Sequence, residues 1–336
     1  MIRTWKVKGR GMFNGNRVLS SKYFIENNCV SCGWGQPGID YPNVVIDFES
    51  YKKVWIEMYG PEYNWNFQGV HHLFESVKKG DFIWTRLDGE YYAAEILDSP
   101  KNLFRLDLSD EADSYDCSIQ LKNIKWKKCG AEDTVPGSIS TFSSNRNSIV
   151  RVDNKESFQN GYSGTSLFSK QVLYGDSVES INDRNMILRF IGPSGFEDII
   201  ALWLYDKYNY VVIPSTNKKS TQTYEFVLVN GNKTNEVYKS SKRIYIQAKN
   251  GKKDLKLIDY VELLEEGDEI WLITSLGTIF DLDNKIEDQK MVQYIKTNKT
   301  YSRNSFSIEN LIDFIFDIRK KNLLPKATIT WTQMFK

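Results

Sequence analysis

Two polar residues at the end of a predicted strand, Gln247 and Lys249, are the first in this sequence whose types and spacing could do chemistry. Side chains in a strand alternate with period 2, so both point to the same face of residues 243–249. An amide and an ammonium at a buried strand end cost free energy unless something binds them. Their presence predicts a bound group at this strand end.

Two carboxylates could complete that site. Glu225 lies in the preceding strand-like run, and we expect adjacent strands of one sheet to bring it beside Gln247, with Lys249 on the same face. Glu197 lies in a helix-like run that comes before these strands. Carboxylate and amide oxygens suit Mg²⁺ or Mn²⁺, and a lysine can orient the attacking water and offset phosphate charge. The set predicts metal-assisted phosphodiester hydrolysis, with Glu225 and Gln247 as metal ligands.

The same residues also allow a purely structural interpretation. A Q-x-K sequence is common on exposed strands, and Glu225 could face solvent opposite Lys249 as a cross-strand ion pair. The helix with Glu197, the order of the strands and the closing strand together favour the catalytic interpretation.

Histidine and cysteine offer little competing chemistry. His71 and His72 are the only histidines, and neighbours on a helix diverge by about 100°, so they cannot easily chelate one ion. This argues against His-based metallonucleases and against Ser/His or Cys/His nucleophiles. Cys29 and Cys32 form a CxxC, but the other two cysteines are too widely split for a typical zinc site, so we expect buried thiols.

The first half of the chain is rich in short β-type runs separated by turn signals. Asp88 and Gly89 have the signature of a tight hairpin between two of these runs. Closely spaced strands of this kind predict a small barrel or a strongly curved sheet. A short helix within residues 66–81 is expected to end at Gly80.

The second half reads as an α/β core. Apolar residues at helical spacing in residues 195–209 precede three strand-like runs, a crossover and a closing strand, residues 269–275. A final helix is expected to begin at Ser305 or Ser307 and to run until Pro325.

Bulk properties set limits on the class of protein. A chain of 336 residues exceeds one ordinary core, so two domains are expected. The net charge of +1 gives the chain no overall positive charge that would attract nucleic acid. Basic patches can still be present locally, because acidic residues elsewhere balance them in the total. We expect no membrane segment and a cytoplasmic location, because no apolar run is long enough to cross a bilayer and cysteines are few.

Residues 190–325 resemble the PD-(D/E)xK nuclease superfamily, especially its Mrr-like restriction endonuclease branch. The similarity rests on Glu197 behind Phe196, on Glu225, and on the run QAK, residues 247–249, in this order. It implies catalytic roles for Glu197, Glu225, Gln247 and Lys249. One departure is that the family's metal-binding acid is usually Asp behind Gly, whereas Glu225 follows Tyr224, and its longer side chain could shift the metal or leave the site inactive.

Residues 1–160 resemble the PUA-like superfamily in its EVE-type form. The similarity rests on a GWG run, a GD-hydrophobic-W run and a VPG segment followed by Phe and Arg. It implies a small β-barrel that accepts a flipped, modified base between aromatic rings, with Trp34, Trp84 and Tyr92 as walls and Trp126 in reserve. Asp81 is either an acceptor for the edge of the base or a turn residue, and we expect the turn. Alternatively these aromatic residues are core, because aromatics pair across strands.

Together these features predict a PUA/EVE-like β-barrel reader in residues 1–165, a linker in 166–189 and a restriction-endonuclease-like α/β domain in 190–336. The expected function is modification-dependent cleavage of double-stranded DNA, a type IV-like restriction activity against phage. A homodimer is expected, because cutting both strands needs two active sites. Two rivals remain: a catalytically inactive reader of modified DNA or RNA that uses a decayed nuclease fold for dimerisation, and an RNA-directed protein.

Overall fold

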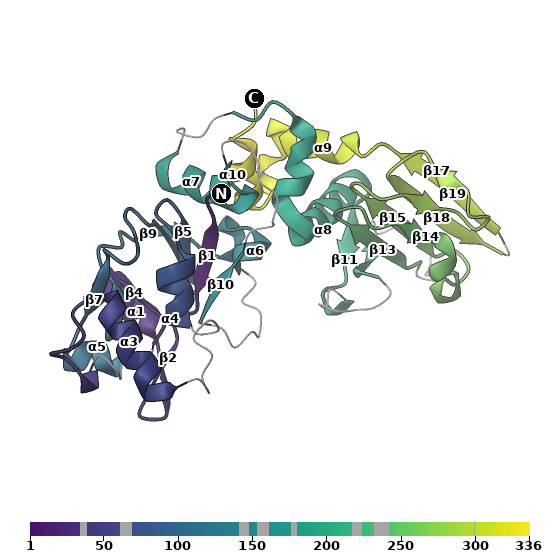
Figure 1. Cartoon of the computed structure of the whole chain (residues 1–336). Coiled ribbons are helices and arrows are strands. Elements are labelled where there is room, and N and C mark those ends of the chain that lie inside the picture. The colour runs from purple at the N-terminus through teal and green to yellow at the C-terminus, as the bar shows by residue number, and fades with distance from the viewer. Residues whose placement is uncertain are drawn as a thin grey trace. The chain divides into compact units, whose positions relative to one another are not determined.

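A computed structural model of the chain describes residues 1–33, 39–60, 69–140, 148–152, 161–175, 180–216, 224–231, 242–298 and 300–336 (Figure 1). The chain divides into two compact units, Met1–Glu179 and Ser180–Lys336. Each unit combines helices with β-sheets, so the predicted mixture of α and β structure is confirmed. Within the described ranges, no helix has the length and apolar character needed to cross a membrane.

The first unit is built on a five-stranded sheet that stays open. Its strand order is β10 (Ile149–Arg151), β1 (Thr4–Val7), β5 (Phe82–Leu87), β6 (Glu90–Glu95) and β9 (Lys127–Gly130). β1 and β5 are parallel and the other neighbours are antiparallel. The β5–β6 turn has positive φ at Asp88 (49°) and Gly89 (83°), which confirms the predicted hairpin. The predicted closed barrel is not found, because β10 and β9 remain unpaired edges among the described strands.

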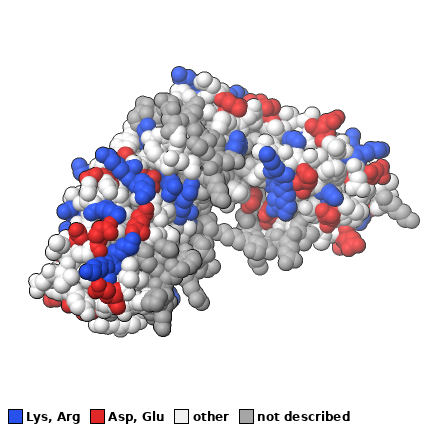
Figure 2. Space-filling view, in the orientation of Figure 1, with Lys and Arg blue, Asp and Glu red and all other residues white. Residues whose placement is uncertain are grey.

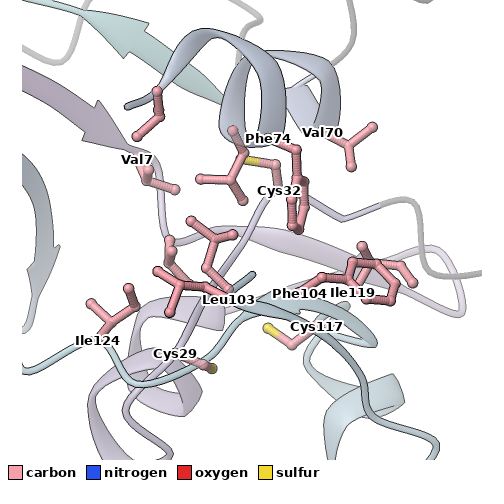
Figure 3. Close-up of a cluster of buried hydrophobic side chains, with 14 of the residues drawn as sticks. Val7, Cys29, Cys32, Val70, Phe74, Leu103, Phe104, Cys117, Ile119 and Ile124 are labelled. Atoms are coloured by element: carbon pink, nitrogen blue, oxygen red, sulfur yellow. The ribbon is translucent and has the colours of Figure 1, made fainter. Parts of the chain in front are cut away.

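Smaller elements complete this unit around one core. A second sheet has the order β4 (Val30–Ser31), β8 (Ile119–Leu121) and β7 (Phe104–Leu106), and β2 (Gly11–Phe13) pairs with β3 (Asn16–Val18). The helices are α1 (Ser20–Glu26), α3 (Phe48–Tyr59), α4 (Gly69–His71), α5 (Asp110–Ser114), α6 (Gly137–Ser140) and α7 (Gly164–Tyr174). Buried side chains of α1, α3, α4 and α5 join those of the strands in a contiguous cluster, part of which is drawn in Figure 3.

The helix that we expected to end at Gly80 ends earlier. α4 continues as a π-helical turn, His72–Ser76, and Val77 is already extended. The reason is Asp81, whose buried carboxylate accepts hydrogen bonds from the backbone N–H groups of Arg3 and Lys78, both at 3.0 Å. These bonds hold the segment before β5 as a turn, which confirms the turn role predicted for Asp81.

The second unit contains the predicted succession of elements. α8 (Ile187–Tyr208) is interrupted by non-helical backbone at Gly192 and ends at Asn209, which adopts the left-handed conformation with φ 56°. The sheet order is β11 (Tyr210–Val212), β12 (Phe226–Asn230), β13 (Ile244–Lys249), β15 (Glu269–Thr274), β18 (Met291–Thr297) and β19 (Thr300–Phe306). β13 and β15 are parallel, and all other neighbours are antiparallel. The crossover between them consists of β14 (Leu255–Lys256) and two 3-10 turns, Leu257–Asp259 and Val261–Leu263.

The end of the chain differs from the prediction. Ser305 lies in β19, in full register with β18, so the helix α9 begins only at Glu309 and extends to Phe316. The Ser307 hydroxyl accepts the backbone N–H of Glu309 at 3.2 Å. The predicted single helix is divided, because a 3-10 turn (Ile318–Leu323) follows α9 and a separate helix α10 (Lys326–Thr332) starts after Pro325.

The two faces of this sheet are covered differently. α8 packs on one face, where the Trp203 and Trp271 rings meet at a centroid distance of 5.9 Å. The crossover covers the other face, and its buried residues Leu257 and Tyr260 join Leu272 in one cluster. Because residues paired across neighbouring strands point to the same side, Gln247, opposite Leu272, lies on the crossover face.

Candidate active site

The β12–β13 pairing brings the first two predicted residues together. Phe226 is opposite Ile246 in this antiparallel pair, so Glu225, one residue earlier, is opposite Gln247. The backbone N–H of Glu225 donates to the carbonyl of Ile246 at 2.8 Å, which extends the pairing by one step. The strand register therefore places the carboxylate beside the amide, as the sequence predicts.

Lys249 joins this group from the last position of β13. Its ammonium group forms an ion pair with the Glu225 carboxylate, and the two side chains are 29% and 20% exposed. The structural interpretation predicts this same cross-strand pair, and the catalytic interpretation requires the same proximity. The pair is partly buried, so its mutual attraction is offset by the cost of removing both charges from water.

Gln247 is the member of the group whose position is hardest to explain structurally. Its side chain is only 6% exposed, and among the described residues its buried Oε1 has no hydrogen-bond partner. A buried acceptor without a partner costs about 1–3 kcal/mol. A cation or a water molecule held at this oxygen would remove that cost, whereas a simple surface ion pair would not need the amide.

Glu197 contributes a second carboxylate from α8. Burial and the negative charge of Glu225 raise its pKa, the positive charge of Lys249 opposes them, and the net result is a pKa of about 7. These electrostatic interactions place Glu197 near Glu225 and Lys249. Helix α8 thus brings Glu197 close to Glu225 and Lys249, and the register of β12 and β13 places Glu225 opposite Gln247.

The end of β13 is fixed by residues that the sequence analysis did not single out. Asn250 donates to the carbonyl of Leu188 in α8 at 2.6 Å and accepts from the Ser275 hydroxyl at 2.8 Å. The backbone N–H of Ser275 donates to the carbonyl of Lys249 at 3.1 Å. The Ser/Thr-rich end of the closing strand was the signal that could have identified Ser275 as a support for Lys249.

The donor set fits a hard divalent cation. Glu197 and Glu225 offer carboxylate oxygens, and the unpartnered amide oxygen of Gln247 is available as a ligand. Within the described ranges, no group of three or more His, Cys, Asp or Glu side chains is arranged to hold a metal ion, and the candidate ligands here comprise two carboxylates and one amide. A site with few protein oxygens suits Mg²⁺, which keeps several of its waters.

The predicted aromatic pocket is not assembled as expected. Trp34 lies outside the described residues. Trp84 is fully buried, and its indole N–H donates to the Ser169 hydroxyl at 2.9 Å, which are the contacts of a core residue. Tyr92 is paired with Thr85, the neighbour of Trp84 on β5, so Tyr92 and Trp84 lie on opposite faces of the sheet. These two side chains therefore cannot wall one pocket.

Three of the four cysteines belong to the core of the first unit, and Trp126 packs against it. The Trp126 indole N–H donates to the carbonyl of Cys29 at 2.9 Å, and its ring packs against the buried cluster. Cys29, Cys32 and Cys117 are buried free thiols in that cluster (Figure 3). Burial raises the pKa of Cys29 to about 12, so its reactive thiolate is scarce at neutral pH. The prediction of buried thiols is confirmed for these three residues.

No protein-family model, no curated protein and no solved structure matches this chain. The function proposed below therefore rests on the residues of this site and on their arrangement.

Proposed function

We propose that the protein is a metal-dependent endodeoxyribonuclease that cleaves DNA carrying modified bases. The observation that carries the chemistry is the buried, unpartnered Gln247 oxygen beside the Glu225 carboxylate and the Lys249 ammonium group. The specificity for modified DNA, and a role in defence against phage, rest on the resemblance of residues 1–160 to modified-base readers.

Each residue of the site has a distinct role in this proposal. Glu225 and Gln247 would hold Mg²⁺ or Mn²⁺, and Glu197 supports the site from α8. When bound, such an ion supplies Lewis-acid stabilisation of phosphate charge and a more acidic water. Lys249 donates hydrogen bonds at the strand end and offsets the negative charge of the phosphate.

The fold of the second unit supports the same function. A helix, three antiparallel strands, a crossover and a parallel fourth strand follow one another in the order that the nuclease resemblance implies. In this proposal the unit of residues 180–336 contains the nuclease domain, and the unit of residues 1–179 is the reader. Double-strand cleavage would use a homodimer, since each unit of this kind holds one site.

Substitution of Lys249 tests the proposal directly. We expect Lys249→Ala to lower Mg²⁺-dependent cleavage of modified phage DNA by about 10²-fold or more, because transition-state charge loses its cationic partner. Lys252→Ala is the matched control, since Lys252 is an exposed lysine close by in sequence. Gel analysis of cleavage in Mg²⁺ and in EDTA measures the effect, and circular dichroism checks folding. Full activity of Lys249→Ala would remove this residue from the mechanism.

Glu225→Gln separates metal binding from the other roles. The substitution removes the charge of one ligand at a sparse site, so cleavage and Mn²⁺ affinity should fall together. Mn²⁺ binding is measured by calorimetry on wild type and variant. Loss of cleavage with unchanged Mn²⁺ affinity would show that Glu225 is not a ligand.

A second candidate function is a non-catalytic reader of modified DNA or RNA. The Glu225–Lys249 ion pair favours it, because it already pairs the carboxylate that a metal would need. The replacement of the usual Asp by Glu points the same way. Wild-type protein that binds neither Mg²⁺ nor Mn²⁺, cuts no DNA and still binds modified duplexes would establish this candidate. Salt-dependent binding to matched DNA and RNA duplexes then identifies the nucleic acid.

A further inference from the structure

A basic cavity of about 860 Å³ lies in the first unit, apart from the core side chains that had been predicted to hold a base. It is lined by four cationic residues, Lys8, Arg10, Arg17 and Arg86. Asp88 is the one acidic residue among the lining residues that the structure describes. A concentration of positive charge of this kind is unexpected in a chain whose net charge is +1.

Two hairpins and the segment before the first of them bring these cations together: Lys8 and Arg10 lie between β1 and β2, Arg17 lies in β3 and Arg86 in β5. β2 and β3 form one hairpin, in which Met12 is directly opposite Arg17, so both side chains project from the same face. The β5–β6 hairpin supplies Arg86 and the turn residue Asp88. Neither hairpin would form the cavity without the other.

The positive charge of the cavity is largely uncompensated. Across the described ranges, Lys8, Arg10 and Arg17 take part in no ion pair, and Arg86 reaches Glu132 only at 3.8 Å. Figure 2 shows the more usual situation, with Lys and Arg intermixed with Asp and Glu on the face in view. Like charges held together without counter-ions repel one another, so an anionic ligand would stabilise this arrangement.

The cavity also offers an apolar surface. Met12 is 56% exposed and Leu19 is 48% exposed, and both line the same space as the arginines. A ligand with negative groups on one side and flat apolar surface on the other matches this lining. Nucleotides in a strand have this character, since phosphates bind cations and base or sugar faces contact apolar side chains.

We propose that this cavity binds the sugar–phosphate backbone of a nucleic-acid strand, with Arg10 and Arg17 on the phosphates and Met12 beside a sugar or base. The proposal rests on the proposed function for the type of ligand. A free nucleotide shares the same chemistry, so the experiment includes both forms. The cavity would give the first unit a contact with DNA that does not depend on base modification.

Charge reversal in the full-length protein tests this site. The Arg10→Glu/Arg17→Glu variant is compared with Lys53→Glu/Lys125→Glu, which reverses the same number of exposed cations outside the cavity. Binding of a fluorescent 20-base-pair unmodified duplex is followed by anisotropy in EDTA at several salt concentrations. We expect the cavity variant to lose affinity by about tenfold or more. The slope of the logarithm of the binding constant against the logarithm of the salt concentration should be smaller in magnitude by about 2, or roughly 0.9 per cation removed. The control should stay within about twofold of wild type.

Three outcomes would overturn the proposal. One is a cavity variant with the affinity and salt slope of the control. Another is tight binding of free dAMP that the duplex does not displace, which would make the cavity a nucleotide site. The third is an Arg10→Gln/Arg17→Gln variant that keeps wild-type affinity and slope. This experiment measures binding and does not depend on cleavage. A protein without nuclease activity would refute the proposed function, and the binding result would still decide the role of the cavity.

Discussion

At the scale of single residues, the amide of Gln247 matters most. A hydrophobic or small residue at this position would bury no side-chain polar atom. The amide instead buries an oxygen that has no hydrogen-bond partner in the described structure. The same neighbourhood contains Glu197, whose pKa is raised to about 7 by burial and by Glu225. An unsatisfied oxygen and neighbouring carboxylates lower stability, and their occurrence together at one strand end is typical of functional sites.

Asp116 allows a pH-dependent test of stability away from that site. Its backbone is left-handed (φ 56°), and its carboxylate accepts the backbone N–H of Met12 at 3.2 Å. Burial raises its pKa from 3.8 to about 6, with a further contribution from Asp113. We expect Asp116→Asn to stabilise the protein by about 1–2 kcal/mol at pH 8, since Asn tolerates the left-handed conformation and removes a buried charge.

The difference between Asp116→Asn and wild type should disappear at low pH. Above pH 6 the wild-type carboxylate is charged in both states, so folding carries the full cost of burying the charge. As pH falls through 6 towards 3.8, the folded state takes up the proton first and wild type gains stability relative to the variant. Urea unfolding at pH 8, 6 and 4 measures this trend. A gap that stays constant across this range would show that the carboxylate is not responsible.

At the scale of elements, strand alternation decides what each aromatic residue does. β5 is a central strand of its sheet, and its successive side chains pack on different layers. Trp84 points to α7, where its ring lies 6.4 Å from that of Phe168. Tyr92, opposite Thr85, points to the other face and is half-buried. Neighbouring aromatics on paired strands therefore serve two separate layers.

Substitution of Trp84 should act on stability. We expect Trp84→Ala to lower the free energy of unfolding by about 3–5 kcal/mol, because a fully buried ring leaves a large cavity. Ser169→Ala should cost about 1–2 kcal/mol by leaving the indole N–H without its acceptor. Tyr92→Phe, at a half-buried position, should stay within about 0.5 kcal/mol. If Trp84→Ala kept its stability and lost only binding to modified DNA, Trp84 would be a base contact instead.

At the scale of the whole molecule, the chain consists of two compact units with separate cores. Helix α7 belongs to the first unit, where Ser166 donates to the carbonyl of Ile2 at 3.1 Å. Residues 166–189, predicted as a linker, include most of this helix. A fragment that tests base recognition should therefore extend to Glu179.

We expect residues 1–179 and 180–336 to fold when they are produced separately. Each contains its own sheets and buried cluster, so each should unfold cooperatively in urea. A fragment of residues 1–165, which lacks most of α7, should be markedly less stable than 1–179. Circular dichroism during urea unfolding measures both. Equal stability of the two N-terminal fragments would show that α7 does not support the sheet.

Local patterns in the sequence determined several features of this protein. Asp88 and Gly89 specify the β5–β6 hairpin because they readily adopt positive φ, and apolar spacing specifies the helical part that contains Glu197. The order of Glu197, Glu225, Gln247 and Lys249 along these elements was also evident from the sequence. Turn chemistry and periodicity depend on neighbours in the chain, so they can be recognised without a structure.

Only the tertiary structure decided the remaining features. Whether the first sheet closes depends on pairing between β10 and β9, edge strands that no local pattern relates to each other. The sequence analysis did not predict β19, because most of its residues are exposed and polar. Its pairing with β18 is what makes it a strand. The missing partner of Gln247 and the basic cavity arise where segments distant in sequence meet. Such contacts are set by packing of the whole unit, because the free energy of one segment depends on which others cover it.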